Sequence, residues 1–213
     1  MKIKRTRPDV RLPQRVFSFG GGVQSMACLV LAAQGTIDYK TFVMVNVGDD
    51  SEHPATISYL HEIAIPYAET NGLTLEVISK TDRHGQPVTL YQKLLNSQRS
   101  IDIPARMSGN GAPGNRNCTG TFKVAPIQRW TKRAGATIEN PATVGVGISV
   151  DEWTRMKSDS GCAWQRLHYP LIDLGIDRDQ CKRIIADAGL PVPPKSSCWF
   201  CPYHDPRSWE RLY

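Results

Sequence analysis

The chain has 213 residues, of which 40% are hydrophobic and 22% are charged, and its formal net charge is +6. This composition is that of an ordinary globular domain and excludes a disordered, collagen-like or fibrous protein. No run of about 18 apolar residues occurs, so we expect no membrane-spanning helix and no membrane partner. The basic start of the chain lacks the apolar stretch of a secretory signal, and we therefore expect a cytoplasmic protein.

Strands and helices are predicted to alternate along the chain. Strands are predicted at 15–19, 41–47, 73–79 and 142–149, with a short strand or extended segment at 168–173. Helices are predicted at 23–35, 54–72, 88–98, 121–135, 178–189 and from 206 onward, while 99–117, 151–168 and 190–205 are expected to be irregular. Pro66 and Pro126 are expected to distort two of the helices. This alternation predicts an α/β domain of three layers, in which helices cover both faces of a parallel sheet.

The first 15 residues form a basic arm. They contain six lysine or arginine residues and one aspartate, so that five of the six net positive charges lie there. Such an arm suits the phosphates of a nucleic acid, with a solvated tail as the alternative. We divide the chain into this arm, 1–15, and one domain, 16–213. Because the sequence stops inside a predicted helix, we also expect it to be truncated at the C-terminus.

A glycine-rich loop, Gly20-Gly21-Gly22, joins the first predicted strand to the first helix. The backbone N–H groups of such a loop and the positive end of the helix can bind a phosphate. Ser18 and Ser25 offer hydroxyl groups beside it. The spacing is neither that of a Walker A loop nor that of a GxGxxG fingerprint. We predict a nucleotide-binding loop of another kind, with a ligand-free glycine turn as the alternative.

The six cysteines fall into different sequence contexts. Cys28 and Cys181 lie in helical patterns and are expected to be packed in the core. Cys198 and Cys201 form a CxxC motif in a proline-flanked loop, and Cys118 lies at a predicted helix start. Two thiolates at CxxC spacing can bind one metal ion or cluster, but further ligands are needed to complete the site.

Together these segments resemble the PP-loop proteins, also called N-type ATP pyrophosphatases or adenine nucleotide alpha-hydrolase-like proteins. The resemblance is closest to the branch of phosphoadenosine phosphosulfate (PAPS) reductases. Residues 20–25 resemble the SGGxDS loop of the family, with Gly20 in place of the first serine and Gln24 in place of the aspartate. The resemblance implies a Rossmann-like three-layer fold that binds ATP with Mg²⁺. Because Gln24 is a poorer Mg²⁺ ligand than aspartate, Asp49 and Asp50 are considered as substitutes.

Further segments match the same branch. Asn46-Val47-Gly48, at the end of the second strand, resembles a DTG-like loop of the branch, and Glu52, Pro54 and Thr56 match the residues that follow it. Lys123 lies in an FKVAP segment, and GISVDEWTRM carries Glu152 and Arg155, with Ser149 in place of an arginine. The resemblance thus implies three sets of site residues: nucleotide binding by Ser18, Gly20, Gly21, Gly22, Gln24, Ser25, Asn46 and Asp49, catalysis by Lys123, Glu152 and Arg155, and metal binding by Cys118, Cys198 and Cys201.

The cysteine pattern departs from the branch at one position. In the branch, a Cys-Cys pair and a later CxxC hold a 4Fe-4S cluster, and here Asn117 replaces the first cysteine. Three cysteine ligands would leave one iron open to sulfur, as in tRNA-thiolating relatives, unless Cys162 is the fourth ligand. A structural zinc site that includes Cys162 or His204 is one alternative, and a redox dithiol is another.

The resemblance therefore implies an enzyme that binds an adenine nucleotide and adenylates its acceptor. Iron-sulfur-assisted transfer of sulfur to that acceptor, a nucleic acid or a small molecule, would follow. One alternative is a reductase of PAPS or adenylyl sulfate, although no cysteine after Cys201 is present as its nucleophile. Another is a non-catalytic nucleotide-binding protein with structural zinc. The oligomeric state is left open, with a homodimer as one alternative.

Overall fold

A parallel β-sheet lies at the centre of the computed structural model, which describes residues 15–97, 101–105, 109, 111, 114 and 116–210. Within these residues, five strands form one sheet in the order β3-β2-β1-β4-β5, and every neighbouring pair is parallel. The strands are β1 (Arg15–Phe19), β2 (Thr41–Asn46), β3 (Thr74–Ser79), β4 (Ala142–Val146) and β5 (Gln165–His168). Apart from Arg15, which begins β1, the predicted basic arm lies outside the described residues.

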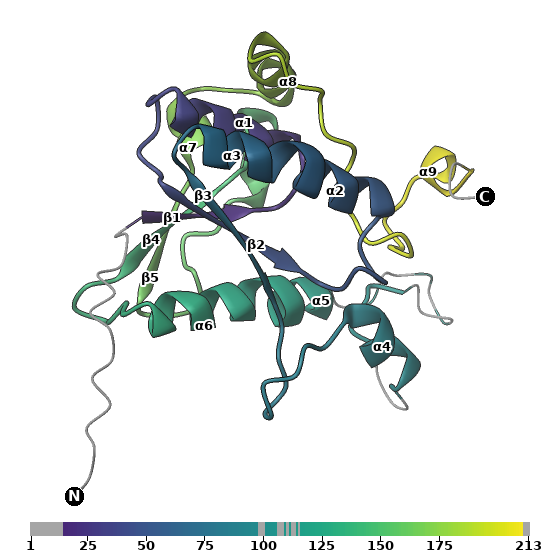
Figure 1. Ribbon diagram of the computed structural model, residues 1–213. Coiled ribbons are helices and arrows are strands. Elements are labelled where there is room, and N and C mark those ends of the chain that lie inside the picture. The colour runs from purple at the N-terminus through teal and green to yellow at the C-terminus, as the bar shows by residue number, and fades with distance from the viewer. Residues whose placement is uncertain are drawn as a thin grey trace, which may run out of the picture.

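Helices cover both faces of the sheet (Figure 1). One layer consists of α1 (Val23–Ala33), α2 (Pro54–Tyr59), α3 (Ile65–Thr70), α7 (Pro170–Asp173) and α8 (Arg178–Asp187), and the other of α5 (Asn117–Thr119) and α6 (Ala125–Arg133). The short helices α4 (Leu90–Leu95) and α9 (Pro206–Glu210) lie near one end of the sheet. The predicted three-layer α/β fold is therefore confirmed. In the described part of the chain, no helix has the length and apolar character needed to cross a membrane.

The strand side chains alternate between two cores. Phe17 and Phe42 are fully buried with α1 on one face, and their ring centroids are 5.0 Å apart. Val16 and Val43 are fully buried on the other face, against Ile127 of α6. Because both faces are covered, the central strands read as nearly continuous apolar runs.

Both prolines that were predicted to distort helices follow a π-helical turn. The turn η1 (Leu60–Ala64) separates α2 from α3, and η2 (Gly120–Val124) separates α5 from α6. Pro66 and Pro126 are the second residues of the helices that follow. A proline lacks the N–H that would bond to the carbonyl four residues earlier, and the wider turn accommodates this loss.

The prediction is wrong around the last strand. The strand β5 lies within 151–168, the stretch expected to be irregular, and it pairs with Ala142–Gly145 of β4. Residues 170–173, expected to be extended, are helical instead. Polar Gln165 can be buried in the strand because its Nε2 donates a hydrogen bond to Thr131 Oγ1 at 2.7 Å. Pro170 is the first residue of α7, where the missing N–H has no intrahelical partner to lose. In the same stretch, Val150–Arg155 forms the 3-10 helix η3.

Candidate functional site

The loops after β1 and β4 meet at the carboxyl edge of the sheet. The strand order reverses between these two strands, which is where ligands bind in open parallel sheets. A Cβ atom at Gly147, after β4, would lie 3.2 Å from the backbone of Gln24 and of Ser25 in α1. The two loops are therefore in close contact, and only a glycine fits at this position without displacing the start of α1.

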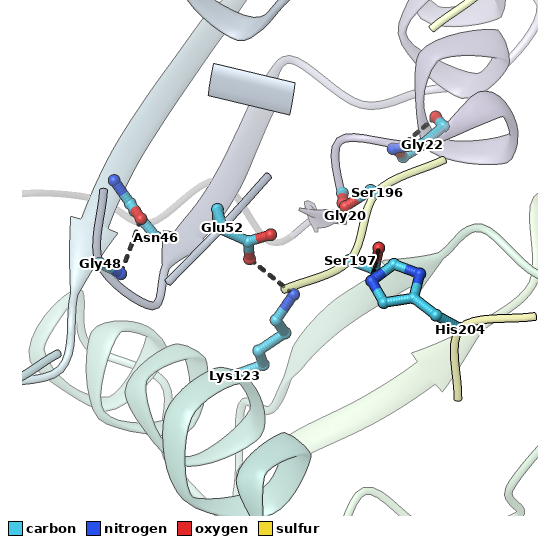
Figure 2. A network of polar contacts seen from close by, with 10 residues as sticks. Gly20, Gly22, Asn46, Gly48, Glu52, Lys123, Ser196, Ser197 and His204 are labelled. Atoms are coloured by element: carbon cyan, nitrogen blue, oxygen red, sulfur yellow. Dashed lines mark hydrogen bonds and ion pairs between the residues drawn. The ribbon is translucent and has the colours of Figure 1, made fainter. Parts of the chain in front are cut away.

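The glycine loop has a fixed shape. Gly21 has a φ of +74°, in the left-handed region that favours glycine, and Gly22 caps α1. Ser25 Oγ donates to the Gly22 carbonyl at 2.8 Å and accepts from Gly22 N at 3.1 Å, so this hydroxyl organises the loop. Ser196 Oγ, from the C-terminal cysteine loop, donates to the Gly20 carbonyl at 2.6 Å (Figure 2). Ser18 lies inside β1, next to the loop.

Gln24, at the aspartate position of the motif, joins three elements. Its side-chain Nε2 donates to Ser149 Oγ at 3.4 Å and to Glu152 Oε2 at 3.2 Å, and its Oε1 accepts from Arg178 at 3.0 Å. The residue is only 8% exposed. The amide thus connects α1 with η3 and α8, and both of its polar atoms already have protein partners.

Two of the predicted catalytic residues lie beside Gln24. Arg155 donates to Glu152 Oε2 at 2.5 Å, and both side chains belong to η3. Arg178, at the start of α8, adds a second guanidinium group that the sequence analysis did not identify. Two arginines and one carboxylate therefore surround the start of α1, close to where the glycine loop would hold phosphates.

The two aspartates in the loop after β2, Asp49 and Asp50, differ in their contacts and in their exposure. Asn46 donates to Asp49 Oδ1 at 2.6 Å and accepts from Gly48 N at 2.8 Å. The Asp50 carboxylate accepts from Ser51 and Thr89 at 2.8 Å each, which ties it to the start of α4. Asp49 is exposed, whereas Asp50 is engaged in structure. Of the two, Asp49 is therefore the better placed for a cation.

Lys123 pairs with a residue outside the predicted site. Its Nζ lies 3.0 Å from Oε1 of Glu52, a carboxylate with no exposed area (Figure 2). Burial lowers the pKa of Lys123, but the Glu52 carboxylate and, less strongly, the thiols of Cys198 and Cys118 outweigh it. The pKa of Lys123 is therefore above its ordinary value. The ammonium lies in the field of both the carboxylate and the thiols.

Three cysteines predicted as ligands converge at the same edge. Cys118 and Cys198 pack against the small apolar cluster of Val47, Leu90 and Phe122. Cys201 follows in a turn, where its N–H donates to the Cys198 carbonyl at 3.1 Å. Burial, followed by the negative charge of Glu52, raises the pKa of the Cys198 thiol to about 12; Cys201 and Cys118 also contribute, while Lys123 lowers it. The Cys198 thiol is therefore strongly affected by its surroundings.

The other cysteines lie elsewhere. The Cys162 carbonyl accepts from the N–H of Gln165, the first residue of β5, so Cys162 lies at the opposite, amino edge of the sheet. The structure therefore does not support Cys162 as a fourth ligand, because the sheet separates it from the other three. Cys28 and Cys181 are fully buried in the core, as expected.

Cys118, Cys198 and Cys201 were predicted to bind an iron-sulfur cluster or, as an alternative, zinc. Across the described residues, no three His, Cys, Asp or Glu side chains stand close enough together to hold a single metal ion. By residue type, a set of three cysteines suits iron in a sulfur cluster, since thiolates are the usual cluster ligands. Cys118, Cys198 and Cys201 are the residues that would hold it. His204 Nε2 is 2.8 Å from the Cys198 carbonyl, and His204 Nδ1 is buried without a partner in the described structure.

Comparisons with known proteins found similar folds among solved structures. No protein-family model matches the chain, and no curated protein matches it. Among solved structures, 17 chains match, including the U34-tRNA thiolase NcsA from Methanococcus maripaludis with its 4Fe-4S cluster. The TM-score is 0.50 at 14% sequence identity, over 97% of this chain. The two proteins share a fold. The present chain spans 65% of the length of that thiolase.

Proposed function

We propose that this protein is an ATP-dependent sulfur transferase of the PP-loop superfamily that uses an iron-sulfur cluster. The observation that carries the proposal is the contact between the cysteine loop and the glycine loop. Ser196, two residues before Cys198, donates to the Gly20 carbonyl, and its Oγ would be 3.5 Å from a Cβ atom at Gly21. A phosphate on the glycine loop and sulfur chemistry at the cysteines would thus be neighbours.

The residues at this edge suit adenylation of an acceptor. The N–H groups of the glycine loop and the start of α1 would bind the phosphates of ATP. An acceptor oxygen would attack the α-phosphorus, and the bond to the β-phosphate would break to release pyrophosphate. Arg155 and Arg178 lie beside α1 and would offset the negative charge of the phosphates.

Sulfur transfer would follow at the cysteine side of the site. A cluster held by Cys118, Cys198 and Cys201 would supply an iron with an open position for inorganic sulfide. Sulfur would form a bond to the acceptor carbon, and the carbon–oxygen bond would break, so that the oxygen leaves with AMP. Lys123, which is held near both thiols and Glu52, would stabilise the negative charge on the departing AMP.

A nucleic acid is the acceptor that the observations favour. The solved structure with the same fold is a tRNA thiolase, and the present chain has a net charge of +6. Beside the cysteine loop, the Arg116 guanidinium lies 5.4 Å from the centre of the Tyr203 ring, which is half exposed. An exposed aromatic ring with an adjacent arginine is typical of sites on which single-stranded bases stack.

The proposal is tested by incubating anaerobically purified protein with ATP, radiolabelled sulfide and unmodified tRNA. We expect label in the RNA together with AMP and pyrophosphate for the wild type and for Cys162→Ala. We expect neither label nor turnover-dependent AMP for Cys198→Ala. Incorporation that does not depend on ATP, or that survives in Cys198→Ala, would contradict the proposal.

A further inference from the structure

Glu52 is a buried carboxylate that matches a glutamate of the reductase branch, for which the resemblance gave no role. It lies in the loop after β2, and its backbone pairs with that of Cys198 in an antiparallel bridge. Oε1 accepts the hydrogen bond from Lys123, as Figure 2 shows. Oε2 is buried and has no hydrogen-bond partner within the described structure. A fully buried charge with half of its acceptors unpaired requires an explanation.

Stability does not explain this carboxylate. A buried ion pair contributes to stability only when hydrogen bonds satisfy its remaining polar atoms, and an unpaired buried oxygen works against folding. The Lys123 side chain is 37% exposed, but burial acts against its charged ammonium, which is held by the Glu52 carboxylate. Removing Glu52 alone would therefore strand a positive charge, whereas replacing both charges by apolar side chains would not.

The position of Glu52 next to the cysteine loop explains the buried carboxylate better than stability does. A free lysine side chain samples many rotamers, and an ion pair restricts them. Backbone hydrogen bonds on both sides of the bridge fix Glu52 relative to the cysteine loop. His53 N donates to the Ser197 carbonyl at 3.0 Å, and Trp199 N donates to the Ser51 carbonyl at 3.1 Å. Whatever Glu52 binds is therefore held at a constant position relative to Cys198.

We infer that Glu52 is a positioning residue, which holds the Lys123 ammonium beside the cysteine loop. The inference rests on the proposed function, in which that ammonium meets negative charge on the reacting groups. In this inference Glu52 acts on turnover through Lys123.

The test uses two variants of Glu52 in the cluster-containing protein. In Glu52→Gln the amide oxygen can still accept from Lys123, and we expect kcat to fall about tenfold; in Glu52→Leu we expect a fall of about 100-fold. The Kd of ATP and the iron and sulfide content should stay at wild-type values. Turnover would thus fall while ATP binding and the cluster stay intact, which a residue that only supports the fold of the site cannot produce.

A second readout needs no turnover. Acylation of Lys123 by an amine-reactive reagent, followed by peptide mass spectrometry, should be several-fold faster in Glu52→Leu than in the wild type. Lys182 provides the internal reference, since its ion pair with Asp179, at 2.7 Å, is exposed. The control variant Asp179→Asn should speed labelling of Lys182 alone and leave kcat unchanged.

Three results would overturn the inference. Unchanged labelling of Lys123 in Glu52→Leu would show that the carboxylate does not hold the ammonium. A rise in the Kd of ATP that parallels the fall in kcat would make Glu52 a structural support of the site, and a loss of iron would make it a support of the cysteine loop. If the wild type transfers no sulfur at all, the proposed function fails, while the labelling experiment still decides whether Glu52 positions Lys123.

Discussion

Gln24 connects the nucleotide loop to two other elements, and Gln24→Ala is expected to separate them. The substitution removes hydrogen bonds to Ser149, to the Glu152 carboxylate and to the Arg178 guanidinium. Each bond to a charged partner contributes about 1.5–3 kcal/mol, and the bond to a neutral hydroxyl about 1 kcal/mol. Because Glu152 and Arg178 are partly exposed and regain water, we expect a net loss of about 2–3 kcal/mol.

Thermal unfolding measures this loss directly. For a domain of this size, about 2–4 °C of melting temperature corresponds to each kcal/mol, so Gln24→Ala should lower Tm by about 5–10 °C. The Kd of ATP, measured by calorimetry, should rise about tenfold, since η3 and α8 no longer support the start of α1. Gln165→Ala is the matched control. It removes one hydrogen bond of a buried glutamine at the amino edge, so Tm should fall slightly and the Kd of ATP should not change.

Two results would refute this account of Gln24. A melting temperature within about 1 °C of the wild type would show that the hydrogen bonds do not join the elements. A gain in Mg²⁺-dependent ATP affinity in Gln24→Asp would show that the position is a cation site. We expect the opposite, because the shorter, negative side chain would face the Glu152 carboxylate, which now accepts from Gln24 at 3.2 Å.

Three further substitutions test other parts of the structure. Gly21→Val should abolish measurable ATP binding while the protein stays folded, because φ is +74° and a Cβ would lie 3.1 Å from a neighbouring threonine methyl group; isothermal titration with ATP checks this. Cys201→Ala should lose most of its iron and sulfide on anaerobic purification, whereas Cys162→Ala should keep both; metal analysis distinguishes them. Tyr39→Phe removes the hydroxyl that lies 2.5 Å from His168 Nδ1, so Tm should fall by about 2–4 °C with sulfur transfer unchanged. A Tyr39→Phe protein with wild-type Tm would show that this contact does not stabilise the fold.

Local patterns in the sequence were sufficient for most of the fold. The apolar runs of β1, β2 and β4 and the glycine after β1 are local signals, and the structure has strands and a helix start at those places. The strand β5 was missed because its burial depends on a bond between Gln165 and Thr131, 34 residues away in the chain. Polar residues that are satisfied by distant partners carry no local strand pattern.

The candidate site shows the same division between local and distant information. The glycine loop and the CxxC are short motifs, and they could be recognised without a structure. Glu52 matches a family segment, but its pairing with Lys123, 71 residues away, could not be predicted, and neither could the contact of Arg178 with Gln24, 154 residues away. The position of Cys162 likewise depends on the sheet, since only the strand order shows that it lies at the other edge.

The central claim, sulfur transfer with an iron-sulfur cluster, is tested most directly by metal analysis. The protein is purified without oxygen, and its visible spectrum and its iron, sulfide and zinc contents are measured. The account predicts iron and acid-labile sulfide in near-equal amounts, with a broad charge-transfer band in the visible region that is lost in Cys198→Ala. Stoichiometric zinc without sulfide would contradict it, and would make the three cysteines a structural metal site.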